Sequence, residues 1–460
     1  MSEDAGPLWA GRFSKPPAPE AETLGRSLEV DERLAFQDVQ AGIAHVAALH
    51  DAGLVSSEEV GALEAALREV GNAIAAGSFE FDLHDEDIHS AIERGVTDLL
   101  GDVGAKLHAG RSRNDLVATD VRLYLLAITR SIDADVRSLM RAFVARALEH
   151  AADPMPGSTH NRAAQPITVG HHLCAHAWAI ARDRGRLADW RARASRSPLG
   201  AGALATSTLG LDPAATAERL GFDAAFENSL DAVSDRDVLQ EFLAFAAILA
   251  THLSRLAADI ARWTDPALGW AELDEGYSTG SSMMPQKRNP DTAELARGKA
   301  ARITGDFVTL TALLQGLPLG YQRDLQEDKE PVFDAVDTIV TVVLALTGAV
   351  ATLRIDTAAM RAACDDPGLY ATDVAEAMVR GGVPFREAHR RTGELLKRLD
   401  TEGRSLRDLT VEEWTDVGVP DGASLLDADR SIASRSGPGG PSPASVLAQC
   451  DALTPARAPH

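Results

Sequence analysis

Cysteine is scarce in this chain of 460 residues: Cys174, Cys364 and Cys450 are the only three. An odd number of widely spaced cysteines excludes a small disulfide-stapled scaffold and matches no cysteine-ligated metal motif. Unpaired thiols are typical of a reducing compartment. The sequence therefore predicts a cytoplasmic protein.

Positive charge is also in short supply, because 68 acidic residues outnumber 45 basic ones and leave a net charge of −23. Such a balance argues against nucleic acid or an anionic membrane as the main partner. Only six basic residues are lysines, against 39 arginines, yet three of the six lie between positions 287 and 329. An anionic substrate must therefore be met by a local basic pocket.

Targeting and membrane-spanning signals are missing as well. The first residues, MSEDAGPLWAGRFSK, contain no basic stretch followed by an apolar one. The most lipid-like run, residues 338–353, is only 16 residues long and contains Gly348. We expect neither a signal peptide nor a membrane span.

Hydrophobic side chains, by contrast, make up 45% of the chain and are spaced for long helices. They recur at intervals of three and four residues, the period of a helix packed against its neighbours. This spacing predicts four long helices, over residues 121–143, 239–263, 303–314 and 332–353. No strand pattern and no internal repeat compete with it. The predicted fold class is all-α, with a long central helical bundle.

Prolines and glycines divide the chain into three predicted domains. Helix-ending or helix-opening prolines flank the long helices, at Pro154, Pro156, Pro266, Pro318 and Pro331. Shorter helices precede the bundle, one with capping chemistry at Ser56, and an irregular loop is expected at 434–443. We predict an N-terminal helical domain over 1–106, a central bundle over 107–355 and a small C-terminal helical domain over 356–460.

The predicted helix that follows Pro331 is apolar on nearly every face. A monomeric bundle would leave a wide part of that surface in water. The sequence therefore predicts an oligomer.

The sharpest candidate for chemistry is the segment Ser278–Glu294, STGSSMMPQKRNPDTAE. Pro290, followed by Asp291 and Glu294 within one turn, is typical of a helix start. A helix N-terminus also favours anions. With Lys287 nearby, an alkoxide at Ser281 would be stabilised there, so this serine is a plausible base for a carbon acid. The alternative is a glycine- and serine-rich linker that merely caps a helix.

Two upstream segments combine charge with hydrogen-bonding groups. The sequence Gly110–Asp115, GRSRND, places two arginines and an amide at a helix start, which suits a carboxylate; the alternative is an N-cap with solvated arginines. The sequence His84–His89, HDEDIH, fits a pocket for a cationic group or a metal site, although its spacing matches no standard metal signature. Helix capping and solvation explain it equally well.

Two downstream segments add proton-transfer groups. His160 follows two hydroxyls in GSTH, and a histidine whose tautomer is fixed by a carboxylate such as Glu294 can shuttle a proton. The segment Gly320–Pro331, GYQRDLQEDKEP, places a phenol, a guanidinium, an amide and an ammonium before a long helix. A structural histidine and a solvated helix cap are the respective alternatives.

Together these segments resemble the argininosuccinate lyases of the fumarase/aspartase superfamily, and the likeness covers nearly the whole chain. The superfamily signature is GSSMMPQKRNP at 280–290. Motifs resembling the argininosuccinate branch are GRSRND at 110–115, DEDIH at 85–89 and DLQEDKE at 324–330, with weaker marks in LWAGRF at 8–13, NSLDAVSDRD at 228–237 and GPGGPSP at 437–443.

That resemblance implies an all-helical homotetramer in which three subunits build each active site. It implies cleavage of argininosuccinate into arginine and fumarate, by removal of a proton next to a carboxylate and expulsion of the guanidino nitrogen. No metal or organic cofactor is expected.

The resemblance also implies roles for individual residues. Ser281 matches the base, Lys287 and Asn289 match the groups that stabilise the aci-carboxylate carbanion, and His160 matches a proton shuttle paired with Glu294. Thr159, Arg113 and Asn114 match the residues that hold the succinyl carboxylates. The other positions expected to bind substrate are Ser27, Asp87, Ser282, Tyr321, Arg323, Gln326 and Lys329, of which Asp87 suits the arginine half by charge.

One stretch departs from the family pattern. Relatives usually read THLQRAQP where this chain has THNRAAQP, at Thr159–Pro166. Arg162 beside His160 could lower the pKa of the histidine or reshape the pocket wall, or it could point away. Arg323 in place of lysine is a milder departure.

Three alternatives to the main interpretation follow. The first is a lyase that releases fumarate from a different N-substituted aspartate. The second is an inactive structural protein like some delta-crystallins, although the expected catalytic residues are all present. The third is metal-dependent hydrolysis at His84, Asp85, Asp87 and His89.

Overall fold

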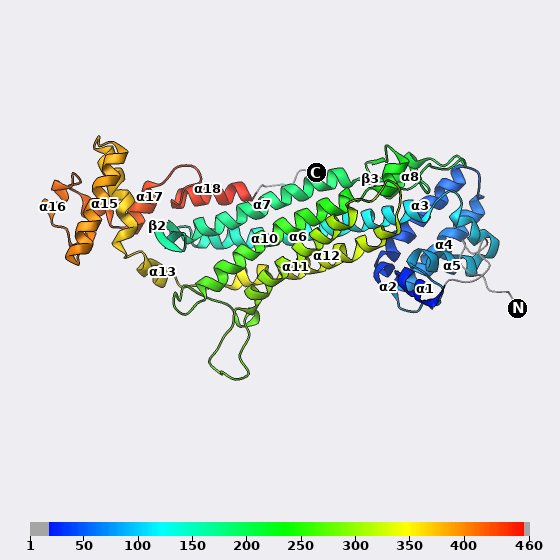
Figure 1. Cartoon of the computed structure of the whole chain (residues 1–460), viewed down its shortest axis with the longest axis horizontal. Coiled ribbons are helices and arrows are strands. Elements are labelled where there is room, and N and C mark those ends of the chain that lie inside the picture. The colour runs from blue at the N-terminus through cyan, green and yellow to red at the C-terminus, as the bar shows by residue number, and fades with distance from the viewer. Residues whose placement is uncertain (1–17, 455–460) are drawn as a thin grey trace. The chain divides into compact units, whose positions relative to one another are not determined.

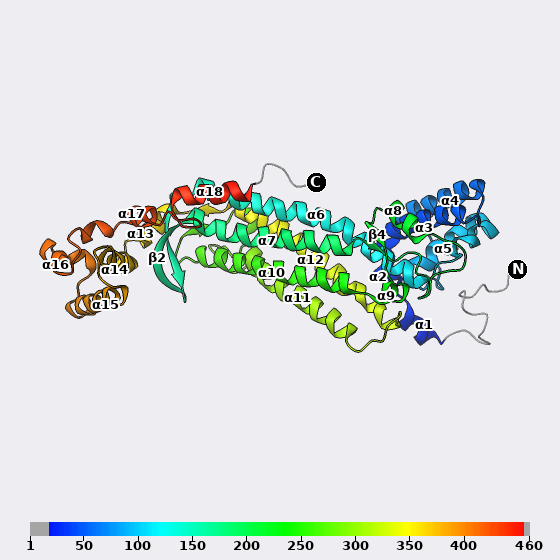
Figure 2. The ribbon, with the colours of Figure 1, turned by 90° about the horizontal axis from the view of Figure 1, so that it is seen from above.

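The computed structural model describes residues 18–454, so the expected motif at 8–13 lies outside the described residues. The chain divides into two compact units: unit 1 comprises 1–133, 186–247 and 302–338, and unit 2 comprises 134–185, 248–301 and 339–460. Five long helices contribute a segment to each unit (Figures 1 and 2). They are α6 (Arg113–Glu149), α7 (Val169–Ala194), α10 (Asp237–Trp263), α11 (Asp291–Leu314) and α12 (Lys329–Thr352).

Unit 1 adds short helices to its segments of the long ones. These are α1 (Pro19–Gly25), α2 (Leu28–Asp31), η2 (Glu32–Leu34), α3 (Ala35–Asp51), α4 (Ser57–Ala75), α5 (Ile88–Leu100), η3 (Gly101–His108), α8 (Pro213–Leu220), α9 (Ser229–Ser234) and η5 (Arg323–Asp328). The strands β3 (Arg196–Ser197) and β4 (Ala224–Ala225) form a short parallel pair. Ser56 and Glu59 form a reciprocal capping box at the start of α4, as the sequence predicted.

Unit 2 contains the hairpin β1 (Pro154–Thr159) and β2 (Arg162–Thr168), the pair β5 (Ala271–Glu272) and β6 (Arg354–Ile355), and η4 (Glu275–Tyr277). Its C-terminal helices are α13 (Thr357–Ala363), η6 (Pro367–Tyr370), α14 (Ala371–Arg380), α15 (Phe385–Glu402), η7 (Leu406–Asp408), α16 (Val411–Asp416), η8 (Gly422–Leu425), α17 (Ala428–Ser434) and α18 (Pro443–Leu453). Tyr370, Met378 and Trp414 are buried in a core of their own there. The predicted loop at 434–443 is irregular over 435–442.

The four predicted long helices are present, but the expectation of only four was wrong. The fifth, α7, was missed because small and polar side chains occupy much of its apolar seam: Cys174 and Ala177 are fully buried, and charged residues interrupt the period. Its packing relies instead on a few large side chains. In unit 1, the Trp190 ring packs at a tilt against Phe242 of α10, and its indole N–H donates to the Val238 carbonyl over 2.8 Å.

The expectation that no strand occurs was also wrong, because β1 and β2 form an antiparallel hairpin. The segment contains prolines that were read as helix boundaries. Pro156 faces Pro166 across the ladder. Both strands of an isolated hairpin are edge strands, where a residue without an N–H is tolerated. A register shift between Gly157 and Ser158 marks a bulge just before the tip.

Helix α12 is less exposed than its composition suggested. Most of its apolar side chains are buried within the chain, and Leu344, 53% exposed, is the large exception. Helix α10 and the helical segment Arg323–Thr352, which includes α12, are long and apolar enough to cross a membrane, and half of each apolar window is buried within the described structure. The wide apolar surface expected on this helix is therefore used mainly inside one chain.

Candidate active site

Asp87 organises the part of the candidate site that unit 1 contributes. It is the N-cap of α5: its carboxylate accepts the Ser90 N–H over 2.8 Å, and the Ser90 hydroxyl lies 3.1 Å from the Asp87 backbone nitrogen. The next amide, that of Ile88, donates to Asp31 over 2.9 Å. Ser27 donates its hydroxyl to the same Asp31 over 2.6 Å and its amide to the Glu86 carbonyl over 2.9 Å. These contacts fix the backbone on both sides of Asp87.

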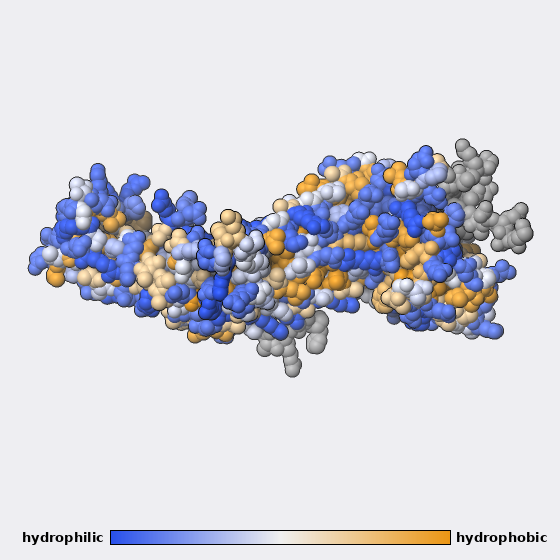
Figure 3. Space-filling model, turned by 90° about the horizontal axis from the view of Figure 1, so that it is seen from below, coloured by the Kyte–Doolittle hydropathy of each residue, from blue (hydrophilic) through white to orange (hydrophobic). Residues whose placement is uncertain are grey.

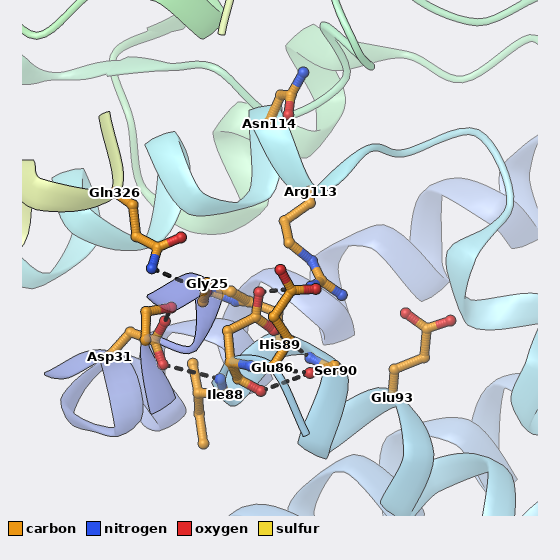
Figure 4. Close-up of polar contacts among 12 residues, drawn as sticks. Gly25, Asp31, Glu86, Ile88, His89, Ser90, Glu93, Arg113, Asn114 and Gln326 are labelled. Atoms are coloured by element: carbon orange, nitrogen blue, oxygen red, sulfur yellow. Dashed lines mark hydrogen bonds and ion pairs between the residues drawn. The ribbon is translucent and has the colours of Figure 1, made fainter. Parts of the chain in front are cut away.

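Arg113, at the start of α6, binds this segment directly. Its Nη1 lies 2.5 Å from the free carboxylate oxygen of Asp87 and 4.0 Å from Glu86. Figure 4 shows Arg113 extending from α6 toward Glu86, while the neighbouring Asn114 points the other way. The Asn114 side chain donates to the Ala203 carbonyl over 3.1 Å. The two residues expected to hold succinyl carboxylates therefore have protein partners in this structure.

A cavity of about 860 Å³ opens beside this segment in unit 1. Arg323 and Gln326 of η5 line it, and both donate to the Gly25 carbonyl, over 2.5 Å and 3.1 Å. Arg323 also pairs with Glu86. The cavity brings together residues from three distant parts of the sequence, and it is large enough for a small polar substrate.

Tyr321 and Lys329 lie around a buried ion-pair cluster at the other side of η5. Asp328 is fully buried, binds Lys329 Nζ at 3.0 Å and pairs with Arg236. Burial opposes its ionisation, but the charges of Lys329 and Arg236 hold the pKa of Asp328 below its usual range. Burial raises the pKa of the Tyr321 phenol, so the phenol stays protonated near neutral pH.

Behind Asp87 lies a buried group of charges. His89 is 2% exposed and its Nδ1 donates to Asp38 over 2.6 Å. Burial works against a charge there, yet Asp38 and the other carboxylates raise the pKa of His89 above its usual value. Burial raises the pKa of Asp120 well above its usual value. For Asp87, burial is outweighed by His89, Arg113 and the cap, which lower its pKa.

The acids and histidines of the segment 84–89 do not point to one position where they could bind a metal ion together. Asp85 pairs with Arg94 at 2.8 Å and His84 with Glu22 at 3.3 Å. Asp87 and His89 have the separate partners just described. The hypothesis of a hydrolytic metal at this segment has no geometric support among these residues.

Unit 2 carries the predicted catalytic loop, which joins η4 to α11. Its base is closed by reciprocal backbone hydrogen bonds between Thr279 and Asn289, of 3.2 and 2.8 Å. The Ser281 oxygen accepts the amides of Met283 and Met284 over 3.3 and 3.0 Å. Those amides lie where they can stabilise negative charge on this oxygen.

The side chains of this loop face solvent. Ser282 and Lys287 are exposed, and Met283 is 87% exposed. Large exposed side chains on a loop closed only at its base leave it free to contact another surface. The loop is therefore positioned at its two ends but not covered along its length.

His160 stands at the tip of the hairpin, between Thr159 and Arg162, which close the two-residue turn. Its φ is 53° and that of Asn161 is 58°, so two consecutive residues other than glycine adopt the left-handed conformation. Thr159, His160 and Arg162 are all exposed. Glu294 on α11 is exposed too, with Arg297 at 4.0 Å, and no hydrogen bond or ion pair joins it to His160 within the described chain.

Sequence reasoning overlooked Glu86. Its carboxylate pairs with Arg323 and lies near Arg113, and its carbonyl accepts the Ser27 amide. Its position directly before Asp87 was the available signal. Unit 1 therefore contributes side chains of alternating charge beside a cavity. Unit 2 contributes a hydroxyl, an ammonium and an imidazole on exposed turns.

Comparison with known proteins gives this arrangement a family. A family described as "Lyase" matches residues 11–305, and one described as "Argininosuccinate lyase C-terminal" matches 368–433. An argininosuccinate lyase of Frankia casuarinae is 50% identical over 451 residues, covering 97% of each chain. The chain belongs to the argininosuccinate lyase family. A second member, from Acidothermus cellulolyticus, is 47% identical over 99% of this chain and 95% of its own.

Solved structures confirm the fold expected for this family. A crystal structure of EDDS lyase in complex with formate matches with a TM-score of 0.84 at 28% identity, over 96% of this chain and 90% of that one. An EDDS lyase variant with bound fumarate matches at 0.82 and 27%, with the same coverage. The all-α, fumarase/aspartase-like architecture predicted from the sequence is confirmed.

His45 supplies a pH-dependent support for the motif at 110–115. It lies on α3, is 3% exposed, and donates its Nε2–H to the Ala109 carbonyl over 2.9 Å. Burial, helped by the charge of Arg111, lowers its pKa to about 3. The unfolded chain, with a pKa near 6.5, binds the extra proton. The stabilising contribution is therefore complete above pH 6.5 and is lost as the pH falls toward 3.

We predict that His45→Gln, which can still donate to Ala109 but does not titrate, reduces the loss of stability below pH 6.5. Urea unfolding at several pH values should show a slope smaller by up to about 1.4 kcal/mol per pH unit. His50→Gln, an exposed histidine on the same helix, is the matched control. Equal slopes for His45→Gln and the wild type would refute the assignment.

Proposed function

We propose that this chain cleaves argininosuccinate into arginine and fumarate. The observation that carries the proposal is the identity of 45–50% to curated argininosuccinate lyases over nearly the full length. The predicted site residues support it, because they include both a basic set for a dianionic succinyl group and the anionic Asp87 for a guanidinium group. A structural relative binds fumarate, the expected product.

In the proposed reaction Ser281 removes the proton next to a carboxylate, and the guanidino nitrogen leaves. The two amides that approach its oxygen favour the alkoxide, and Lys287 and Asn289 stabilise the carbanion and its aci-carboxylate. His160 and Glu294 form the proton relay. Closure of the exposed loop would exclude water and strengthen these interactions.

The substrate is held by charged and polar groups of unit 1 and by hydroxyl groups of unit 2, contributed by different subunits. Arg113, Asn114, Thr159 and Ser282 bind the succinyl carboxylates, and Asp87 binds the arginine half. The present pairing of Asp87 with Arg113 at 2.5 Å means that substrate must exchange this ion pair for its own charges. A substrate that carries a carboxylate and a guanidinium at the right separation gives Arg113 and Asp87 each a new partner of opposite charge. This requirement favours argininosuccinate over smaller N-substituted aspartates.

We further propose a cytoplasmic homotetramer whose active sites combine residues from three subunits. His160, Lys287 and Glu294 are exposed in the single chain. Apolar areas lie between hydrophilic ones on the face in Figure 3, and on α11 Leu295 and Val308 are 62% and 58% exposed. Association would cover such residues and bring the exposed catalytic turns against other subunits.

The first prediction that follows from the proposed function concerns the substrate. With argininosuccinate, the purified protein should release fumarate, followed by its ultraviolet absorbance, and equimolar arginine. Adenylosuccinate, aspartate and other N-substituted aspartates should give no release. Release from one of those compounds but not from argininosuccinate would replace the proposed substrate, and release from none would favour the inactive, crystallin-like alternative.

The second prediction concerns the base. Ser281→Ala should lower kcat by roughly 10²–10⁴-fold, the contribution of a positioned general base, while KM changes little. Ser278→Ala is the matched control, since this serine lies in the same loop and its hydroxyl donates to the Asp274 carbonyl over 3.1 Å. Similar kcat values for both variants would remove Ser281 from the mechanism.

The third prediction concerns sharing of the site between subunits. Ser281→Ala and Asn114→Ala should each be nearly inactive as pure oligomers. After dissociation and joint reassembly, mixed oligomers should regain activity, because some sites then receive an intact residue from each partner. The same two proteins mixed without dissociation are the control. Hybrid oligomers that form but stay inactive would contradict shared sites.

A further inference from the structure

A cluster of metal-binding side chains lies in unit 2, outside the proposed catalytic residues. His172 and His176 are one turn apart on α7, and both Nε2 atoms contact the same Oδ2 of Asp259 on α10, at 2.8 and 2.9 Å. The three potential ligand atoms lie within 4.8 Å of one another. No role has been assigned to these residues above.

The donor set suits a divalent transition-metal ion. Two histidines four residues apart on one helix face, completed by a carboxylate from a second element, form a frequent zinc-binding arrangement. Two imidazoles and one carboxylate also suit cobalt and nickel ions, whereas magnesium and calcium ions prefer oxygen. The chemistry of the cluster therefore selects for zinc-like ions.

The hydrogen bonds of the cluster define what a metal ion would have to displace. Each imidazole now shares its Nε2 proton with Asp259, over 2.8 and 2.9 Å. Metals bind neutral imidazole and ionised carboxylate. Binding needs each neutral ring to carry its proton on Nδ1 instead of Nε2. This change of tautomer releases the lone pairs that face Asp259.

The cluster is accessible to an ion. The side chains of His172, His176 and Asp259 are 25%, 15% and 33% exposed. His172 and Asp259 line a cavity of about 280 Å³ that Thr159 and Arg262 also line. An ion bound by three protein ligands would have room there for water at its remaining positions.

A second histidine–carboxylate group, of Asp38, His89 and Asp120, is a weaker candidate. All three side chains are at most 2% exposed, and His89 already donates to Asp38. Burial also raises the pKa of Asp120, which disfavours the carboxylate form that a cation binds. This group therefore lacks the access that an ion would require.

We propose that His172, His176 and Asp259 form a binding site for a divalent transition-metal ion of the zinc class, which links α7 to α10. The ion replaces the two hydrogen bonds between the histidines and Asp259 with coordinate bonds to both Nε2 atoms and to the carboxylate. It is a site in addition to the proposed catalytic residues, and the lyase reaction does not require it. Arg262 at the same cavity weakens the attraction for a cation and leaves room for an anion beside the metal.

The test uses the full-length protein after dialysis against a chelator. Titration calorimetry with Zn²⁺ should give one ion per chain, and Co²⁺ should produce visible absorption bands that Zn²⁺ abolishes. His172→Asn, His176→Asn and Asp259→Asn should each weaken Zn²⁺ binding by more than about 100-fold, the upper end of what loss of an outer-shell partner costs. His389→Asn, an exposed histidine on α15, is the matched control and should bind as the wild type does.

A measurement on the wild type guards against variants that fail to fold. Bound Zn²⁺ should slow hydrogen–deuterium exchange at the C2 position of His172 and His176, but not of His389, as mass spectrometry of peptides can show. Weakening of more than about 100-fold in every folded variant, with slowed exchange at both histidines, supports the site. No saturable Zn²⁺ binding, smaller effects in the variants, or unchanged exchange at these histidines overturns it.

Discussion

The contact between Asp87 and Arg113 is the constraint on which the candidate site of unit 1 depends. It joins the start of α5 to the start of α6 by a charge-assisted bond of 2.5 Å between side chains 26 residues apart. The Asp87 side chain is 8% exposed and that of Arg113 is 31% exposed, so the carboxylate above all would be costly to leave without a partner. The cap at Ser90 and the contacts through Asp31 hold Asp87 in place. A ligand that separates the pair must therefore neutralise both members.

The strongly acidic composition gives this arrangement its meaning. A chain with a net charge of −23 repels anions at long range, and cationic groups must be concentrated locally to bind one. Around Asp87 this concentration consists of Arg113, His89, whose pKa is raised by the neighbouring carboxylates, and, at the cavity, Arg323. Each of them is balanced by a neighbouring carboxylate. Such a balanced array costs less to bury than isolated charges and still offers partners to a zwitterionic ligand.

Regular periodicity and capping chemistry made part of the fold predictable. The seam of α10 and the cap at Ser56 are local signals, and both were found where the sequence placed them. Helix α7 and the hairpin were missed because their signals are not local. Ala177 can fill the apolar seam of a helix only where a neighbouring helix approaches closely. Pro156 has no N–H, so it can occupy a strand only at a position where the ladder needs no hydrogen bond from its nitrogen. The domain boundaries remain predictions.

Site residues were predicted by motif, but their contacts could not be. Nothing in the sequence indicates that Arg113 binds Asp87, because that pairing depends on how two helix starts meet. The departure at Asn161 shows the converse. The family resemblance leads to the expectation of leucine there, but the position has a φ of 58°, which asparagine tolerates better than a large apolar residue. The side-chain oxygen Oδ1 of Asn161 also accepts a hydrogen bond from Arg262 over 3.4 Å.

This local explanation changes what the departure means for function. The turn that presents His160 is a strained one, with two left-handed residues in succession, and strain of this kind persists only where surrounding contacts hold it. Asparagine lowers the conformational cost at the tip without altering the imidazole beside it, and Arg162 is exposed next to the turn. Asn161 thus stabilises the turn that presents His160, the predicted proton shuttle, and this is a reason to expect the reaction of the family rather than a different one.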